Sequence, residues 1–324
     1  MKSEINKLID EKLAGFKASS AEMVSQYNGE NATTGSYNGR QVLELLQNCD
    51  DEGAELVEIE VDRGEGFVVV SNTGRSFSLK GYKSLLYPNL SGKNKKNYIG
   101  NKGLGFRSLL NWSTCIEIVS NNLLFKISND NRIRVWEESF SKDEQATIRR
   151  EYEIGEHHIP IPLLAVPEKA IEVSPSDFAT TIKIYFEDKF YDDVISQLNA
   201  ITAETILFLR NIKEIRFKGL SDKEDIRCRK FVVSEEESLL TQRIYSGDNE
   251  WLIYSEDESI PLHLLDEDSK KGNLHYQIKV AIEKDFKNSS EYLYSFFPTN
   301  ILLKQPYILH ATFDLDPSRN QIIK

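Results

Sequence analysis

The chain has 324 residues, with 40 Lys and Arg against 51 Asp and Glu, which gives a formal net charge of −11. Hydrophobic residues make up 40% and charged residues 28%, an ordinary balance for a globular protein, and only 17 Gly and 9 Pro exclude a fibrous or low-complexity chain. The acidic balance disfavours a broad nucleic-acid surface, because phosphate neutralisation needs clustered Lys and Arg. No apolar run reaches the roughly 20 residues of a membrane-spanning helix, and the cysteines are widely spaced. We therefore expect a cytoplasmic protein of about two domains with no membrane partner.

Periodic apolar residues divide the chain into expected elements. Helical spacing indicates helices within 1–27, 38–53, 103–113 and 192–212. Alternating and β-branched runs indicate strands at 54–62, 67–72, 115–120, 123–128 and 180–186, and strand-like runs dominate after 212. Loops are expected at 28–37 and over most of 78–104, and the charged, Pro-containing segment 139–178 is expected at the periphery.

Three polar residues of the second expected helix, Glu44, Asn48 and Asp51, stand at positions i, i+4 and i+7. This spacing places them on one helix face, opposite the apolar residues. A carboxylate beside an amide oxygen can polarise a water molecule and hold a hard cation such as Mg²⁺. Polar residues at this spacing also form ordinary solvated helix faces, so the pattern alone does not decide between a site and a surface.

A glycine-rich segment, YIGNKGLGF, carries Gly100, Gly103 and Gly105 directly before an expected helix, with Lys102 among them. Glycine lets the backbone approach a ligand closely, and the N–H groups at a helix N-terminus attract phosphate. A flexible turn is the alternative. The segment is neither a Rossmann fingerprint nor a P-loop, because no parallel βαβ pattern surrounds it and the upstream glycine of a P-loop is missing.

The third element is a strand end at Asn72, followed by Thr73 and Gly74. Taken in order, these three elements resemble the GHKL (Bergerat-fold) ATPases, which include gyrase-type topoisomerases, heat-shock chaperone ATPases, histidine kinases and MutL. The stretches ELLQNCDDEGAE, IGNKGLGFRSLL, ETILFLRNIKEI and FFPTN…LHATFDLDPSRN look most like sacsin-type modules and their bacterial relatives. The resemblance implies an α+β fold. A Bergerat-type sandwich, with a mixed, mostly antiparallel sheet under helices, would occupy 1–187, and a smaller α+β transducer domain would occupy 188–324.

The resemblance also implies roles for single residues. Glu44 would be the general base that activates the attacking water, Asn48 would hold Mg²⁺, and Asp51 would support the site from the same helix face. Residues 88–104 would form an ATP lid that hinges on the glycines. The expected nucleotide contacts are Asn48, Asp51, Asn72, Gly74, Gly100, Lys102, Gly103, Gly105, Phe106 and Thr180.

One position departs from the family pattern. Asn72 stands where the family has the adenine-reading Asp of D-x-G-x-G. Asn can accept the adenine amino proton through its oxygen, but it carries no charge, so adenine affinity or selectivity is an open question. A literal D-x-G-x-G begins at Asp62, and we reject it because it lies in the expected turn between two strands. Thr180 matches a family Thr that hydrogen-bonds near adenine, and an ordinary β-branched strand residue is the alternative.

In split-type relatives, a basic residue of the second domain reaches the γ-phosphate. Arg319, in LDPSRNQ, resembles the chaperone-type Ser-Arg loop, and Lys304, in LLKQPY, is the competing candidate. For both residues an exposed surface cation is the alternative. The sequence stops at Lys324, shortly after this loop, and we expect it to be the N-terminal fragment of a longer protein.

The leading hypothesis is an ATPase that binds ATP with Mg²⁺ and hydrolyses it slowly to close and release a lid or clamp. It would serve a chaperone-like role or a bacterial antiviral defence system. One alternative is a non-catalytic nucleotide-sensing scaffold, which Asn72 motivates, and another is a DNA-clamp ATPase of the MutL or topoisomerase type. A histidine kinase is disfavoured because no phosphoacceptor helix is found. The expected partners are ATP, downstream domains or a protein partner, and an ATP-dependent second copy, whereas the net charge disfavours nucleic acid.

Overall fold

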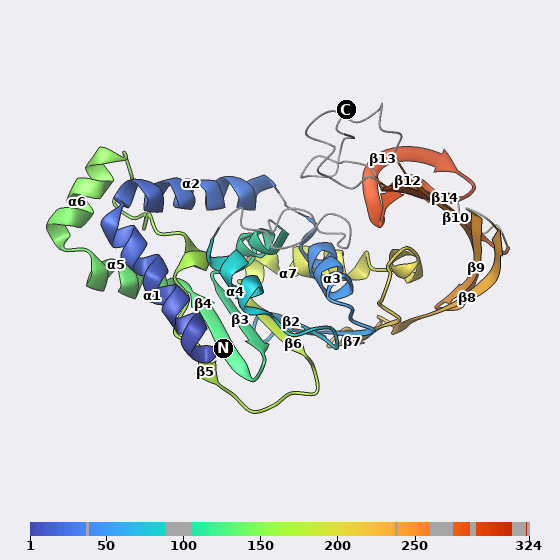
Figure 1. Cartoon of the computed structure of the whole chain (residues 1–324), viewed down its shortest axis with the longest axis horizontal. Helices are drawn as coiled ribbons and strands as arrows, with labels where there is room; N and C mark the ends of the chain where they lie inside the picture. Colours follow the sequence, from blue (N-terminus) through green and yellow to red (C-terminus); the bar gives the residue numbers. More distant parts are fainter. Residues whose placement is uncertain are drawn as a thin grey trace.

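The computed structural model describes residues 1–36, 39–87, 105–236, 239–259, 275–285, 290–312 and 322. Its α-helices are α1 (Lys2–Ala18), α2 (Ser20–Ser36), α3 (Gln41–Asp51), α4 (Leu79–Leu86), α5 (Asn129–Ser139), α6 (Lys142–Glu151) and α7 (Tyr191–Asn199) (Figure 1). Short 3₁₀ helices span Gly105–Asn111, Leu163–Ala165, Asp188–Phe190 and Ala203–Ile206. Within these ranges, none of the helices is both long enough and apolar enough to cross a bilayer.

The strands fall into two groups along the chain. The first group comprises β1 (Leu56–Asp62), β2 (Phe67–Asn72), β3 (Cys115–Ser120), β4 (Leu123–Ser128), β5 (Ile171–Glu172), β6 (Thr180–Tyr185) and β7 (Glu214–Lys218). The second comprises β8 (Ile226–Glu236), β9 (Leu239–Ser246), β10 (Asn249–Ser259), β11 (His275–Glu283), β12 (Ser290–Ser295), β13 (Phe297–Gln305) and β14 (Ile308–Ala311).

The described strands form one continuous sheet in the order β13–β12–β14–β11–β10–β9–β8–β7–β1–β2–β6–β3–β4–β5. Its neighbours are antiparallel except for the pairs β1–β7 and β12–β14. Helices α3, α4 and α7 lie over one face of the first group of strands, whereas the second group curls away beside them (Figure 1). The predicted α+β class, with a mostly antiparallel sheet under helices, is confirmed.

Strand alternation decides which face of the sheet meets the helices. On β1, Val57 and Ile59 point into the helix-covered core and are fully buried, while Glu58 points to the other face. β2 and β6 continue the pattern with buried Val70 and Ile182. Each apolar side chain buried in this way stabilises the fold by about 1.5–3 kcal/mol relative to exposure.

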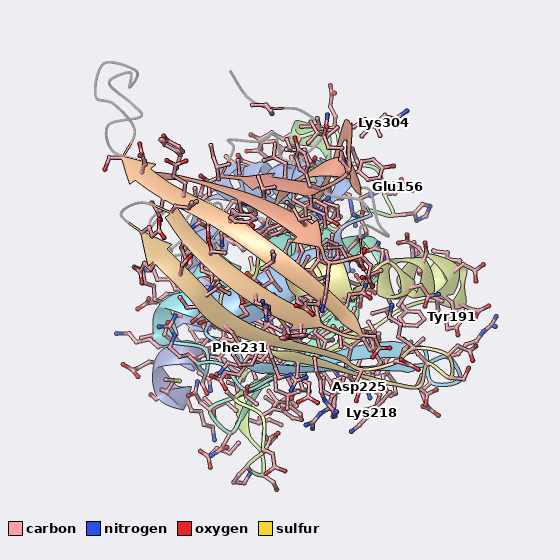
Figure 2. All side chains as sticks on the ribbon, turned by 90° about the vertical axis from the view of Figure 1, so that its right-hand side faces the viewer. Glu156, Tyr191, Lys218, Asp225, Phe231 and Lys304 are labelled. Carbon is pink, nitrogen blue, oxygen red and sulfur yellow. The ribbon has the colours of Figure 1, made fainter. Side chains whose placement is uncertain are left out.

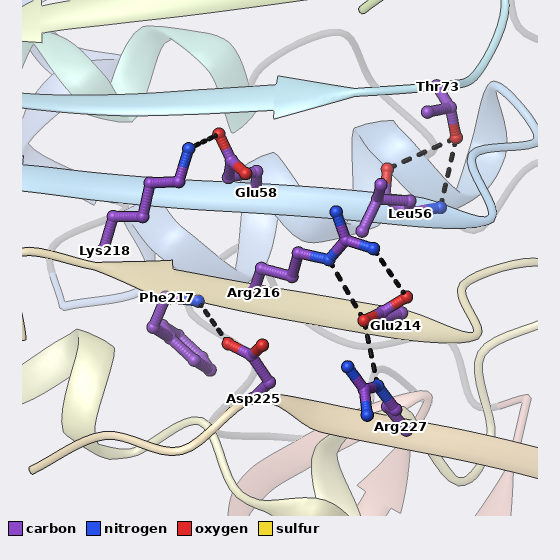
Figure 3. A network of polar contacts seen from close by, with 9 residues as sticks. All are labelled: Leu56, Glu58, Thr73, Glu214, Arg216, Phe217, Lys218, Asp225 and Arg227. Carbon is purple, nitrogen blue, oxygen red and sulfur yellow. Dashed lines mark hydrogen bonds and ion pairs between the residues drawn. The ribbon is translucent and has the colours of Figure 1, made fainter.

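The second group of strands faces the reader in Figure 2, with Phe231 and Lys304 at opposite margins. Phe231 is 52% exposed on β8, so this half of the sheet is less completely covered than the first. The helix-free face of β1 and β7 carries ion pairs instead (Figure 3). Nε of Arg216 and Nε of Arg227 each lie 3.0 Å from Oε1 of Glu214, and the hydrogen bond from Arg216 is the main cause that lowers the pKa of Glu214.

Two segments predicted as loops are helical. Helix α2 runs through 28–36, because its first half packs Met23 and Val24 into a small core with Phe16 and Trp136. Helix α4 occupies the start of 78–104: Ser78 caps it by accepting from the Gly81 N–H, and its apolar side is buried. The remainder of that prediction, 88–104, lies outside the described residues.

The expectation that 139–178 is peripheral is wrong for its centre. Ile161 and Val166 belong to the same small core as Phe16, while Leu163 and Leu164 pack into the main core under the sheet. A charged and Pro-containing composition hid these apolar side chains, because they follow neither strand nor helix periodicity.

The sheet and its core continue through the boundary expected near residue 188. β7 pairs in parallel with β1, and Val194 and Leu198 of α7 pack into the core shared by β1 and α3. Nε1 of Trp112 also donates to Asp193 of α7 at 2.6 Å. The division into 1–187 and 188–324 stays a prediction, while packing with the first group of strands extends to β7.

Candidate functional site

Helix α3 is buried on its polar face as well as on its apolar face. Glu44 is 9% exposed and Asp51 is 7% exposed, and Asn48 is half-buried between them. The solvated-face alternative for this pattern is therefore wrong. Burying a carboxylate costs free energy unless polar partners surround it, so a helix that keeps such residues inside is typical of a functional site or a structural network.

The covering element on this face is the 3₁₀ helix that begins at Gly105. A Cβ atom built at Gly105 would lie 2.9 Å from Cδ of Glu44 and would overlap the carboxylate. A side chain at this position would require the Glu44 carboxylate to move, whereas glycine allows the close approach of main chain to carboxylate. The structure thus brings together two residues that the sequence singled out separately, the expected base and the last glycine of the expected phosphate loop.

A buried charge network fixes this 3₁₀ helix. Arg107 is 3% exposed and donates to the Leu85 carbonyl oxygen at 3.3 Å. Its guanidinium also interacts with Glu30 of α2, whose carboxylate accepts from the main-chain N–H groups of Leu163 and Leu164. Burial raises the pKa of Glu30 and lowers the pKa of Arg107. The predicted phosphate-loop helix is a 3₁₀ helix held by these contacts, and Phe106 on it is buried in the core.

The second part of the site is a polar layer at the ends of three adjacent strands. Asn72 of β2 is paired in register with Thr180 of β6, and Thr180 is paired with Ser120 of β3. These residues are 5%, 3% and 2% exposed, on the same sheet face as Val70 and Ile182. The layer puts polar side chains where an apolar core face would otherwise continue.

The polar layer is tightly hydrogen-bonded. Oδ1 of Asn72 accepts from the Gly74 N–H at 3.0 Å. Oγ of Ser120 lies 3.0 Å from Oγ1 of Thr180, donates to the Ala179 carbonyl at 2.8 Å and accepts from the Phe77 N–H at 3.0 Å. These bonds fix the rotamers of all three side chains, which is the preorganisation that a recognition site needs.

The turn after Asn72 docks against the end of α3. A Cβ atom at Gly74 would lie 2.8 Å from the Glu52 carbonyl oxygen, so only glycine fits there. Arg75 donates to the Asp51 carbonyl oxygen and to Oε2 of Glu52, each at 3.2 Å. The β2 end and the C-terminal turn of α3 are therefore direct neighbours, as the expected site requires.

A hollow of about 320 Å³ lies beyond the strand ends. Its lining comes from the β2–α4 turn, the β3–β4 turn and residues 176–179, and it includes Ser76, Ser120 and Phe178. None of its described lining residues belongs to α3. It adjoins the polar layer at Ser120, and the sequence had given no signal for it.

Several expected site residues are not brought to this place. Gly100, Lys102, Gly103 and Arg319 lie outside the described residues, as does the expected lid 88–104. Lys304 is an exposed residue of β13 with a φ of 49°, and within the described part of the chain no contact joins it to Glu44 or to the polar layer. Asp62 is the last residue of β1 and accepts from the Glu65 N–H of the β1–β2 turn, which is a structural role at the hairpin.

Sequence reasoning missed two residues that hold α3 in place. Asp50 is fully buried, and its carboxylate accepts from the N–H groups of Arg210, Asn211 and Ile212 at 2.8–3.1 Å. Arg40 precedes the helix and donates to the Pro298 carbonyl oxygen at 3.0 Å. In both cases the partners are main-chain atoms of residues far along the chain. Such atoms are common to all residue types, so no residue pattern reveals the contact. Ser120 was missed for the same reason, although its place at a strand end was a usable signal.

The donor set around α3 suits Mg²⁺ only together with a phosphate ligand. Among the described residues, no three His, Cys, Asp or Glu side chains gather as a metal site. Asn48 offers one amide oxygen on the half-buried face of α3, beside two carboxylate residues. Mg²⁺ commonly takes one or two protein ligands and completes its shell with phosphate oxygens and water, so this sparse set fits a metal that arrives with a nucleotide.

No protein-family model matches the chain, and no curated protein matches it. Among solved structures, it is similar to the N-terminal domain of a DNA repair protein, with 12% identity over 91% of each chain and a TM-score of 0.45. It is also similar to the ATPase region of Saccharomyces cerevisiae topoisomerase II, with 10% identity over 68% of this chain and 58% of that chain and a TM-score of 0.39. The ATPase and transducer domains of Balamuthia mandrillaris DNA topoisomerase II give 13% identity, 68% and 56% coverage and a TM-score of 0.38. This chain thus spans little more than half of those topoisomerase chains.

Proposed function

We propose that this chain is a GHKL-type nucleotide-binding module that binds ATP with Mg²⁺ and hydrolyses it slowly. The observation that carries the proposal is the contact between the Glu44 carboxylate and the main chain of Gly105. A buried carboxylate held against the start of a 3₁₀ helix can take a proton from water, while the main-chain N–H groups at that helix start would face phosphate.

We assign roles to the described residues of the site as follows. Glu44 would accept the proton of the attacking water, and Asn48, one helical turn further along α3, would contribute a metal ligand. The polar layer of Asn72, Ser120 and Thr180 would hold the base at the other end of the nucleotide. When bound, Mg²⁺ would offset the negative charge of the phosphate oxygens.

We further propose that nucleotide binding is coupled to the second group of strands. Arg40, just before α3, donates to Pro298 of β13, and Asp50, near the end of α3, holds the loop at 210–212 that precedes β7, so a shift of α3 would reach the second group directly at Arg40. Lys304 and Arg319 remain the candidate cations for the γ-phosphate. A clamp that closes on ATP, with a second copy or with downstream domains, would suit a sacsin-like, chaperone-like or defence-system role.

A non-catalytic nucleotide sensor is the second candidate, and Asn72 favours it. In place of a charged adenine reader, the chain has a neutral amide whose oxygen is already engaged by Gly74. Such a site would bind nucleotide and change conformation without measurable turnover.

The test measures phosphate release and nucleotide binding with the whole chain. Glu44→Ala and Glu44→Gln should lower ATP turnover by about 100-fold or more, because a positioned general base contributes about 10²–10⁴ in rate, while binding of a non-hydrolysable ATP analogue changes little. Glu65→Gln, at an exposed turn residue, is the matched control and should keep full turnover. Binding without any turnover in the unmodified chain would favour the sensor. Absence of binding by every purine triphosphate at millimolar concentration would overturn both proposals.

A further inference from the structure

The carboxamide of Asn72 has one orientation. Its side-chain acceptor faces the Gly74 N–H at 3.0 Å, and a main-chain N–H can only donate, so the atom in that position is the oxygen Oδ1. The side chain is 5% exposed, and Gly74 is locked against the Glu52 carbonyl oxygen. Turning the amide over would set two N–H donors against each other in a buried place, which is unfavourable.

The other half of the carboxamide, Nδ2, therefore points its two N–H donors elsewhere. In the part of the chain that the structure describes, no residue accepts a hydrogen bond from it. An Asp at this position would have two acceptor oxygens, one for the Gly74 N–H and one for a ligand. With Asn, the turn takes the only acceptor, and a ligand meets a donor.

Thr180, the cross-strand partner of Asn72, has the opposite polarity. Ser120 lies next to it and has a single hydroxyl proton, which the Ala179 carbonyl oxygen must receive at 2.8 Å because a carbonyl cannot donate. The 3.0 Å contact between Ser120 and Thr180 then requires Thr180 to be the donor. With its proton directed to Ser120, Oγ1 of Thr180 presents only lone pairs to a ligand.

We propose that this pair reads a 6-oxopurine, such as hypoxanthine or guanine, in preference to adenine. Nδ2 of Asn72 donates to O6 of the base, and Oγ1 of Thr180 accepts from N1–H. Adenine carries the reverse pattern, an amino donor at C6 and an acceptor at N1, and would set donor against donor and acceptor against acceptor. The inference rests on the proposed function, because it takes the polar layer as the base end of the nucleotide site.

The experiment compares equilibrium binding of ATP, ITP and GTP, with Mg²⁺, to the whole chain carrying Glu44→Gln, which keeps the triphosphates intact. We expect ITP to bind about tenfold or more tightly than ATP, since each mismatched buried hydrogen bond costs affinity. ITP is the decisive probe, because its base differs from that of ATP only in the 6-oxo group and the proton on N1. Unlike GTP, it has no 2-amino group that could add a contact of its own. The ratio of the ITP and ATP dissociation constants cancels any effect on the phosphates.

Three variants sharpen the test. Asn72→Asp is isosteric and keeps an acceptor for Gly74, so the chain should stay folded while the ratio shifts toward ATP by about tenfold or more. Thr180→Val removes the acceptor and should reduce the preference for ITP over ATP. Thr180→Ser retains the hydroxyl and should preserve that preference. Equal or tighter binding of ATP by the chain with Asn72 intact would overturn the inference and leave the proposed function standing. Loss of binding for all three nucleotides would overturn the proposed function itself.

Discussion

Two buried polar regions of the molecule differ in how their groups are satisfied. The strand-end layer of Asn72, Ser120 and Thr180 consists of neutral groups, each fixed by a hydrogen bond to a neighbour. The second group of strands carries a basic cluster, formed by Lys230 of β8, Lys279 of β11 and His310 of β14. The cluster shares the loop at 207–212 with Asp50 of α3.

In the basic cluster, burial itself changes the chemistry. His310 packs between the rings of Phe208 and Phe296, with ring centroids 4.8 Å from each, and desolvation together with the charges of Lys279 and Arg210 lowers its pKa to about 3. Desolvation also lowers the pKa of Lys279 to about 8. Lys230 donates to the carbonyl oxygens of Leu207 and Leu209. These groups are held by packing and main-chain carbonyls, as structural residues are.

The comparison teaches that burial of polar groups alone does not mark a binding site. What distinguishes the strand-end layer is that its internal hydrogen bonds fix the polarity of the remaining atoms, a donor on Asn72 and an acceptor on Thr180. In the basic cluster, burial instead lowers the pKa values of Lys230, Lys279 and His310. Experiments can break or sharpen this distinction.

The largest effect is expected at Asp50, which joins α3 to the loop that also contacts Lys230 of the basic cluster. Asp50→Ala would leave the N–H groups of Arg210, Asn211 and Ile212 without their carboxylate acceptor. We expect the free energy of unfolding to fall by about 3 kcal/mol or more, measured by denaturant titration. Asp62→Ala, which removes a turn carboxylate with one N–H partner, should cost about 1 kcal/mol or less. Equal losses of unfolding free energy in the two variants would show that the contact of Asp50 with three main-chain amides stabilises the fold no more than a single turn contact does.

The next effect is a pH dependence from His310. Its pKa in the folded chain, about 3, lies below the ordinary histidine value of 6.5, so the unfolded chain binds more protons between these values and stability rises with pH there. Acidification from pH 7 to 5 should therefore cost about 2 kcal/mol through this residue. His310→Phe should remove that part of the loss, and His158→Phe, at an exposed histidine, should not. Identical pH profiles for all three chains would contradict the structural role of the cluster.

A smaller effect is expected at Gly105. Gly105→Ala places a methyl group against the Glu44 carboxylate and should lower nucleotide turnover by about tenfold, with nucleotide affinity less changed. Gly15→Ala is the matched control: its Cβ meets nothing within 4 Å in α1, so it should leave turnover unchanged and stabilise the helix by about 0.5–1 kcal/mol. Full turnover in Gly105→Ala would separate Glu44 from the chemistry.

Local periodicity predicted the elements that carry the site. Helix α3, the β1–β2 and β3–β4 hairpins and β6 lie where the sequence indicated them, because each has a regular apolar pattern and a clear turn. The second half of α2 and the whole of α4 were expected to be loops, since Gly, Asn and Lys within them resemble loop composition. Their burial against other elements overrides that preference.

The sequence by itself determined the residue types of the site and their order, Glu44 and Asn48 on one helix face, Asn72 at a strand end and Gly105 at a helix start. Only the tertiary structure decided that Glu44 meets Gly105, that Asn72 lies beside Thr180, and that Ser120 fixes the proton of Thr180. The physical reason is the topology of the sheet. β6 enters between β2 and β3, so side chains far apart in the chain become cross-strand neighbours, and no local pattern encodes that pairing.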